Sequence, residues 1–217
     1  MSNSSAKMIL AKTQRMDTIF TIMFEVKKKY KSGNAAEIIS EAILAGDITG
    51  EIGQNEFADS LEVSRIPVRE ALIALEYHGL IEKMTNQHVR VIDLDDEDIK
   101  NIFADMSLLE LEALKTLPER IVQELSSSEQ TEFHRKIYGH TPSPLRRVFL
   151  KVIAETYITF IMRHSDGRKI ESAFEDVRHS LRNTDALKAA YAIYAESLAD
   201  ELISIRRNKA ATIEEEE

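Results

Sequence analysis

Two arginines, Arg65 and Arg69, have the residue type and spacing in this 217-residue chain that most directly indicate a binding chemistry. Side chains four positions apart on a helix share one face, so both guanidinium groups would lie together. A guanidinium group can donate two parallel hydrogen bonds to O6 and N7 of guanine, the commonest specific contact in the DNA major groove. The pair therefore predicts recognition of a base edge or a clamp on the adjoining phosphates. The pattern leaves one alternative open, a helical hairpin whose arginines are only solvated.

Two short helices joined by a tight turn would position these arginines, within the segment 56–79. Apolar residues recur at helical spacing on both; they are Phe57, Ala58 and Leu61 on the first, and Val68, Ala71, Leu72 and Leu75 on the second. Ser64 stands at the N-cap of the second helix, where its hydroxyl can accept a backbone hydrogen bond. Pro67 falls in the first turn, where it is tolerated, and Gly79 suits a left-handed C-terminal residue. Such a helix-turn-helix presents the N-terminus of its second helix to the major groove.

The flanking segments predict one further helix and a β-hairpin. Asn34 with Glu37 forms a capping-box pattern before an apolar stripe, which comprises Ile38, Ile39, Ala42 and Ile43. Gly46 ends that helix, and we expect the segment up to Gly53 to be a loop. After Gly79, the segments 80–84 and 88–92 alternate apolar and polar residues, as two strands of a hairpin do.

Two sequence segments closely resemble the winged helix-turn-helix signature of the GntR family of bacterial transcription regulators. They are V-S-R-I-P-V-R-E-A-L at 63–72 and L-E-Y-H-G-L-I at 75–81, and the resemblance extends over about 39–98. The resemblance implies binding to double-stranded operator DNA. The implied DNA-binding residues are Arg65, Arg69, Ser64, Asn55, Thr85, Asn86, Gln87 and His88. Lys83 and Arg90 would add positive charge to the same surface.

The chain departs from the family pattern at three places in this domain. Glu62 takes the turn position where the family commonly has glycine, which predicts local backbone strain of order 1 kcal/mol. Gln54 and Asn55 stand where relatives often carry arginine or glutamate. The hairpin tip has Gln87 and His88 in place of the family's Arg-Gly.

The remainder of the chain predicts helices only, so the fold class is mainly α: a winged helix-turn-helix followed by an all-α bundle. Asp95 is a suitable cap for the first of these helices. The expected helices span about 96–117, 119–125, 129–138, 145–164, 169–182 and 185–207. The expected domains are an N-terminal helical extension (1–32), the winged domain (33–94), a helical effector-binding or dimerisation domain (95–208) and a disordered acidic tail (209–217).

The helical half resembles the GntR subgroup with a helical C-terminal domain of the FCD type, known from FadR-like regulators. That domain senses a small carboxylate, often through a bound metal. Of the metal ligands that the resemblance implies, only His134 is retained, because Gln130 and Phe174 occupy two of the other positions. An ungapped alignment places Glu196 at the last ligand position, where it could serve as a substitute ligand. We therefore expect a shortened domain without a bound divalent metal, and these four residues mark the candidate effector pocket.

Composition excludes several classes of protein. The chain has no cysteine, so it forms neither disulfides nor thiolate metal sites, and no apolar run reaches membrane-spanning length. A formal net charge of −9 argues against a protein that coats DNA without regard to sequence. No phosphate loop or nucleophile motif is present, so we do not expect an enzyme.

Together these patterns predict a cytoplasmic homodimeric regulator, expected to be a repressor, that binds a palindromic operator and responds to a small organic acid. The alternative is a DNA-binding regulator whose helical bundle serves only for dimerisation or partner docking.

Overall fold

The computed structural model describes residues 35–85 and 88–216, with side chains as far as Lys209. The chain divides into two compact units, with boundaries between Asp93 and Leu94 and between Asn208 and Lys209. The boundary expected from the sequence lay between 94 and 95. The expected N-terminal extension and the capping residue Asn34 lie outside the described residues.

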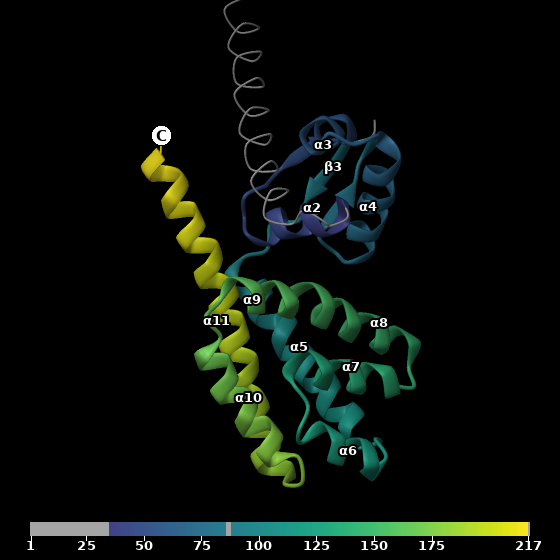
Figure 1. Cartoon of the computed structure of the whole chain (residues 1–217), viewed down its shortest axis with the longest axis vertical. Helices are drawn as coiled ribbons and strands as arrows, with labels where there is room; N and C mark the ends of the chain where they lie inside the picture. The colour runs from purple at the N-terminus through teal and green to yellow at the C-terminus, as the bar shows by residue number, and fades with distance from the viewer. Residues whose placement is uncertain (1–34, 86–87, 217) are drawn as a thin grey trace, which may run out of the picture. The chain divides into compact units, whose positions relative to one another are not determined.

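The first unit has the helices and the hairpin that the sequence predicts. Its elements are α2 (Ala35–Leu44), β1 (Glu51–Gly53), α3 (Gln54–Leu61), α4 (Arg65–Tyr77), β2 (Ile81–Lys83) and β3 (His88–Val91) (Figure 1). β3 is the central strand of an antiparallel sheet of order β1-β3-β2, pairing Ile52 with Val89 on one side and Ile81 with Val91 on the other. α4 packs against α2, α3 and β2, and α3 packs against β1. The winged-helix part of the fold is therefore confirmed.

Strand β1 was expected to be part of a loop. The strand follows Gly50 and ends in Gly53, and its three residues are too few to display an alternating pattern. The structure pairs Glu51 with Arg90 across the sheet, and Ile52 is fully buried. This register gives the hairpin a third strand, which anchors β3 against the helices.

The turn before α4 contains the backbone strain that the sequence predicts. Glu62 has φ 54° and ψ 38°, the left-handed region that favours glycine. The turn is closed by hydrogen bonds from the N–H groups of Glu62 and Val63 to the carbonyls of Asp59 and Ala58. Among the described residues, Glu62 is the one non-glycine residue with a positive φ.

Replacing Glu62 with glycine is expected to raise the free energy of unfolding relative to Glu62→Ala by about 0.5–1 kcal/mol. Both variants lose the carboxylate, so the difference between their free energies of unfolding reports the cost of the left-handed backbone for a residue with a side chain. The greater entropy of glycine in the unfolded state reduces this difference. Urea denaturation of the two variants measures this difference. Equal stability of the two variants would show that the turn is not strained.

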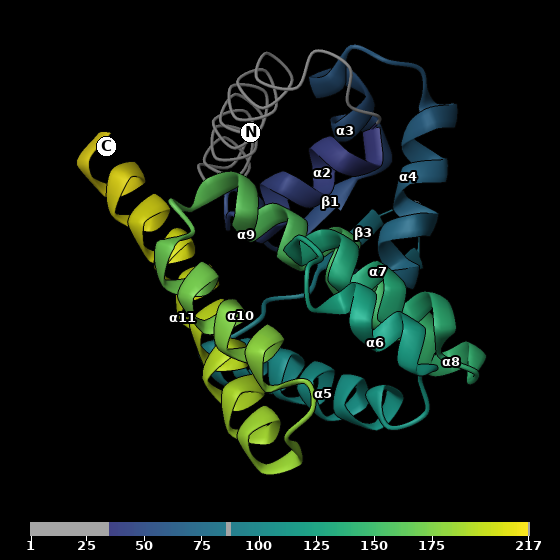
Figure 2. The same cartoon turned by 60° about the horizontal axis from the view of Figure 1, so that its bottom comes forward.

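The second unit is entirely helical. It contains α5 (Asp96–Leu114), α6 (Glu119–Leu125), α7 (Gln130–His140), α8 (Pro144–Val152), the π-helix η2 (Ile153–Ile158), α9 (Thr159–His164), α10 (Arg168–Ser180) and, as far as Asn208, α11 (Thr184–Glu216). α7 packs against α5 and α8. α10 and α11 run side by side in Figures 1 and 2. Asp95 caps α5 as predicted, because its carboxylate accepts a hydrogen bond from the Asp98 N–H at 2.8 Å.

Two helices of this unit differ from the sequence prediction. The segment expected as one α-helix over 145–164 contains the π-helical turn η2, where the Thr159 hydroxyl bonds the Ala154 carbonyl five residues back. The segment 209–217 was expected to be a disordered tail, and the structure draws α11 as far as Glu216. Extending an existing helix needs no new nucleation, and glutamate is a good helix former.

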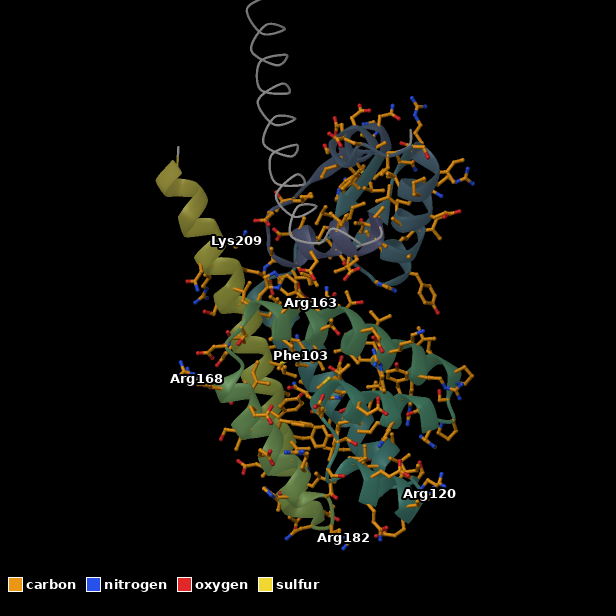
Figure 3. The ribbon with its side chains drawn as sticks, in the orientation of Figure 1. Phe103, Arg120, Arg163, Arg168, Arg182 and Lys209 are labelled. Carbon is orange, nitrogen blue, oxygen red and sulfur yellow. The ribbon has the colours of Figure 1, made fainter. Side chains whose placement is uncertain are left out.

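The core of the helical unit is mainly aromatic and aliphatic, and several of its charged residues face outward. Figure 3 shows Phe103, which is fully buried, between the helices. Arg120, Arg168 and Arg182 project from the outside of the same unit, where their side chains are mostly exposed. The four aromatic residues that the sequence predicts as core are all buried: Tyr157, Phe160, Tyr191 and Tyr194.

Candidate DNA-binding surface and buried polar cluster

Arg65 and Arg69 both lie exposed on the first two turns of α4. The opposite side of α4 is anchored in the core by four buried residues, Val68, Ala71, Leu72 and Leu75. Because burial fixes the rotation of the helix about its axis, the two guanidinium groups are held on the outer surface. The structure thus brings together the two arginines that the sequence analysis singled out.

The residues around the arginines are arranged partly as predicted. Ser64 is the N-cap of α4 with an extended backbone, but its exposed hydroxyl makes no capping hydrogen bond within the described part of the chain. Asn55 is exposed on the first turn of α3. An open pocket between α3, α4 and the sheet has Gln54, Arg69 and Lys83 in its lining. Three polar side chains from three elements therefore converge beside α4.

The structure describes two of the four hairpin residues that were predicted to contact DNA. Thr85 and His88 are exposed at the two ends of the β2–β3 connection. Asn86 and Gln87, also predicted to contact DNA, lie outside the described residues. Arg90, expected to add positive charge, is bound to Glu51, with 3.1 Å between Nη2 and Oε1. Much of the Arg90 charge is thus compensated, and Lys83 is the better-placed cation of the sheet.

A second group of functional side chains is buried inside the helical unit. His134 on α7 is 0% exposed, and both of its ring nitrogens are hydrogen-bonded. Nδ1 lies 2.7 Å from Oε1 of Glu110 on α5, and Nε2 lies 2.8 Å from the hydroxyl of Tyr194 on α11. The Tyr191 hydroxyl donates to the other Glu110 oxygen at 3.1 Å, and Gln130 Nε2 donates to the Tyr194 hydroxyl at 2.6 Å. The cluster therefore joins three helices through five buried polar side chains.

These hydrogen bonds share one consistent direction. With the Gln130 amide donating to the Tyr194 oxygen, the Tyr194 hydroxyl hydrogen is directed at His134 Nε2. A neutral imidazole that accepts at Nε2 carries its hydrogen on Nδ1, and it donates that hydrogen to Glu110. Glu110, accepting from His134 and Tyr191, is the final acceptor of the cluster. One acceptor, Gln130 Oε1, is buried without a protein partner among the described residues.

Aromatic rings enclose the cluster and exclude solvent from it. Phe174 lies edge-on to Phe133 with a centroid distance of 5.1 Å, and Tyr194 stacks on His134 at 5.8 Å. The Arg178 guanidinium group lies over the Phe174 ring, 5.3 Å from its centroid. This dry surrounding strengthens every hydrogen bond within the cluster and raises the cost of breaking one.

The residues at this site do not fit the metal centre that the resemblance implies. Three of the four candidate pocket residues, His134, Gln130 and Phe174, do lie together, but the phenyl ring offers no ligand atom. Glu196, the proposed substitute ligand, is exposed on α11, and Tyr194 takes the inward position two residues earlier. Both His134 nitrogens are already engaged. Among the described residues, no group of three or more His, Cys, Asp or Glu side chains is arranged to hold a metal ion.

Glu110, Tyr191 and Tyr194 were not predicted as site residues. Glu110 lies four positions after Met106 and seven after Phe103, which are both buried on the same face of α5. An acidic residue on a buried helix face needs a partner, so this periodicity was the signal that could have found it. The two tyrosines gave no comparable signal, because their spacing is also that of an ordinary core.

The buried tyrosines predict a loss of stability at high pH. Burial, reinforced by the Glu110 charge, raises the pKa of Tyr191 and of Tyr194 well above the usual range. Burial alone raises the pKa of Tyr157 to about 12. In the unfolded chain these phenols lose their protons near pH 10, so the unfolded state then binds fewer protons than the folded state. Stability should be constant below about pH 10 and fall above it, by about 1.4 kcal/mol per pH unit for each tyrosine.

Urea denaturation between pH 8 and 11 measures this loss, and the tyrosinate absorbance follows the ionisation of the phenols. The Tyr191→Phe variant is expected to show a shallower decline, because it removes one of the buried titrating groups. Complete titration of the tyrosines near pH 10 with the helical circular dichroism unchanged would contradict the prediction.

Comparisons with known proteins bear on the fold. No protein-family model matches the sequence, and no curated protein matches it significantly. Lar of Listeria monocytogenes, which controls the expression of the agr system and mediates virulence, has a similar structure. Lar is 15% identical to this chain, and the TM-score is 0.50. The similarity covers 78% of this chain and 95% of Lar. At this identity the similarity supports the fold alone.

Two other solved structures are also similar. McbR/YncC of E. coli is 14% identical, with a TM-score of 0.47 and coverage of 87% of this chain and 98% of that one. A GntR-family transcriptional regulator from Pseudomonas syringae pv. tomato is 20% identical, with a TM-score of 0.43 and coverage of 92% and 98%. None of the helices in the described part of the chain has the length and apolarity needed to span a membrane.

Proposed function

We propose that this chain is a GntR-type transcriptional regulator that inserts α4 into the DNA major groove. The observation that carries the proposal is the outward position of Arg65 and Arg69 on a helix whose rotation is fixed by its buried face. The sequence segment that contains them is the one that resembles the GntR signature. Arg69 also shares a pocket with Gln54 and Lys83, so the polar surface extends from α4 to α3 and the sheet.

The remaining parts of the proposal concern the assembly. Two copies of the winged domain in a homodimer bind two half-sites related by the same twofold axis, which requires a roughly palindromic operator. Occupation of a promoter by such a dimer gives repression. The acidic net charge of −9 reduces sequence-independent binding, which is mostly electrostatic, while the arginines retain contact with specific bases.

Selection of bound DNA from a random duplex pool by the full chain tests this function. The expected result is enrichment of one inverted repeat, bound with the stoichiometry of a dimer. The Arg65→Ala/Arg69→Ala variant, carried through the same rounds, should enrich no such repeat. Failure of the wild-type chain to enrich any sequence would overturn the proposal.

A second role, confined to the helical unit, is favoured by the buried cluster. The position that a ligand would need at His134 is filled by the protein's own Glu110 and Tyr194 side chains. The cluster also ties α5, α7 and α11 into one body, which suits a rigid assembly module. We therefore favour a bundle that serves for dimerisation over one that senses a metal-bound carboxylate.

Thermal melts separate these two roles. With Zn²⁺, Mn²⁺ or small organic acids such as citrate, the melting temperature of the full chain should not rise in a saturable way, because a ligand that binds the folded state must raise it. A saturable rise that His134→Phe abolishes would restore the sensor interpretation.

A further inference from the structure

The outer face of α4 is apolar at three positions, which is unusual for a helix surface in water. Ile66 is 70% exposed, Ile73 is 52% exposed and Tyr77 is 67% exposed. Seven and eleven residues separate Ile73 and Tyr77 from Ile66, so the three side chains lie on one face, two and three turns along. That face is opposite the buried residues Val68 and Leu72.

This apolar stripe coincides with the cationic part of the winged domain. Arg65 directly precedes Ile66 and Arg69 follows it by three residues, and both are exposed. Polyanionic DNA complements these charges, whereas a hydrophobic protein partner would have to desolvate both guanidinium groups. The exposed acids of α4 beside the stripe are Glu70 and Glu76. Glu70 lies near the leading end of the helix, and its carboxylate is able to accept a hydrogen bond from the amino group of cytosine. The surroundings of the stripe therefore suit a duplex.

One apolar group is available on the floor of the major groove, the C5-methyl group of thymine. Residues in the first turns of a recognition helix are those that reach the base edges. Ile66 is the second residue of α4 and, as an aliphatic side chain, it can read only shape and apolar contact. Ile73 and Tyr77 lie farther along the helix, away from its leading end.

We infer that Ile66 is a specificity-determining residue that contacts the C5-methyl group of a thymine, adjacent to the base pair that Arg65 or Arg69 reads. The inference rests on the proposed DNA-binding function and adds the chemical identity of one operator base. Burial of the methyl group between the duplex and Ile66 stabilises the complex, and no hydrogen bond is involved. A thymine in each half-site is therefore preferred, next to the position that the arginine contacts.

Uracil substitution isolates this contact, because deoxyuridine pairs as thymidine does and lacks only the methyl group. Each thymine of the operator selected by the wild-type chain is replaced in turn, and the dissociation constant is measured by fluorescence anisotropy. At one thymine position in each half-site, replacement by uracil should raise the dissociation constant of the wild-type chain about fourfold for each methyl group removed. A fourfold change corresponds to the free energy of burying one group the size of a methylene. Ile66→Ala should bind the thymine and uracil operators equally well. Leu145→Ala, which truncates an 80% exposed leucine of the helical unit, should retain the wild-type penalty.

The possible outcomes separate the inference from the function on which it rests. If the wild-type chain selects no operator, both fail. If an operator is selected and the methyl penalty is absent or persists in Ile66→Ala, the inference alone is overturned. A change in the sedimentation of the free protein on Ile66→Ala, with DNA preference unaltered, would assign the stripe to protein contact and would also overturn it. Loss of the methyl penalty in Ile66→Ala, with its circular dichroism spectrum unchanged, supports it.

Discussion

Replacing Glu110 with alanine is expected to lower the free energy of unfolding of the helical unit by about 3–5 kcal/mol. The carboxylate is the common acceptor of His134 Nδ1 and the Tyr191 hydroxyl, and all three side chains are almost fully buried. Its removal leaves two donors without an acceptor in a site that aromatic rings close to water. Each such donor costs about 1–3 kcal/mol, and the vacated volume adds a cavity term. Urea denaturation of the full chain, followed by far-ultraviolet circular dichroism, measures the change.

Glu112 provides a matched control for this effect. It lies two residues later on the same helix, is half-exposed and is paired with Lys115 at the surface. Glu112→Ala should leave the denaturation midpoint close to that of the wild type, since exposed ion pairs contribute little. Glu110→Gln retains one acceptor oxygen at the same place, so it should lose less than half as much stability as Glu110→Ala. Equal stability of Glu110→Ala and Glu112→Ala would show that the buried cluster does not hold the helices together.

The winged unit was largely predictable from sequence because its elements carry local signals. Ser64, Pro67 and Gly79 mark the ends of α4, and each lies at its predicted position, with Gly79 at φ 71°, although the Ser64 hydroxyl makes no capping hydrogen bond among the described residues. The left-handed backbone at Glu62 was also predictable, since the turn geometry demands it whatever the residue. Strand β1 was missed because a three-residue strand is specified by its partner β3 and not by its own pattern.

The buried cluster was only partly predictable because its contacts are distant in sequence. His134 meets Glu110 across 24 residues and Tyr194 across 60, so no local spacing connects them. The ungapped alignment favoured Glu196, whereas the three-dimensional packing of α11 presents Tyr194. Two helix positions that are two residues apart point to different faces. A small error in the alignment therefore selected the exposed carboxylate of Glu196 in place of the buried phenol of Tyr194.

The two parts of the molecule therefore depend on different physics. On α4, a buried apolar face fixes the helix so that charged and apolar groups are free to meet a partner. In the helical unit, the buried polar groups that could have bound a ligand are satisfied by one another, with the exception of Gln130 Oε1. Substitutions at the first surface should alter binding and leave stability unchanged, whereas substitutions in the cluster should do the reverse.

Replacing Arg69 with alanine is accordingly expected to weaken binding of the selected operator by about 1–3 kcal/mol, roughly 5- to 150-fold. The guanidinium group is exposed on α4, on the surface proposed to face the groove, and it borders the pocket shared with Gln54 and Lys83. Truncation removes either a bidentate contact to guanine or a phosphate contact. Because the side chain is exposed and anchors nothing in the core, the free energy of unfolding should stay the same. Fluorescence anisotropy at several salt concentrations measures the loss.

Arg69→Lys distinguishes the two kinds of contact. Lysine keeps the positive charge but lacks the planar fork, so it retains a phosphate contact and weakens a bidentate guanine contact. If Arg69 reads a base, both variants lose affinity, and the Ala variant becomes tolerant of substitution at one operator position. If it clamps a phosphate, Lys is nearly neutral, and Ala reduces the salt dependence by about one unit of slope. Arg120→Ala removes an exposed arginine from the helical unit and should leave operator affinity unchanged. Wild-type affinity in Arg69→Ala would exclude this side chain from the DNA interface, since neither contact survives truncation to a methyl group.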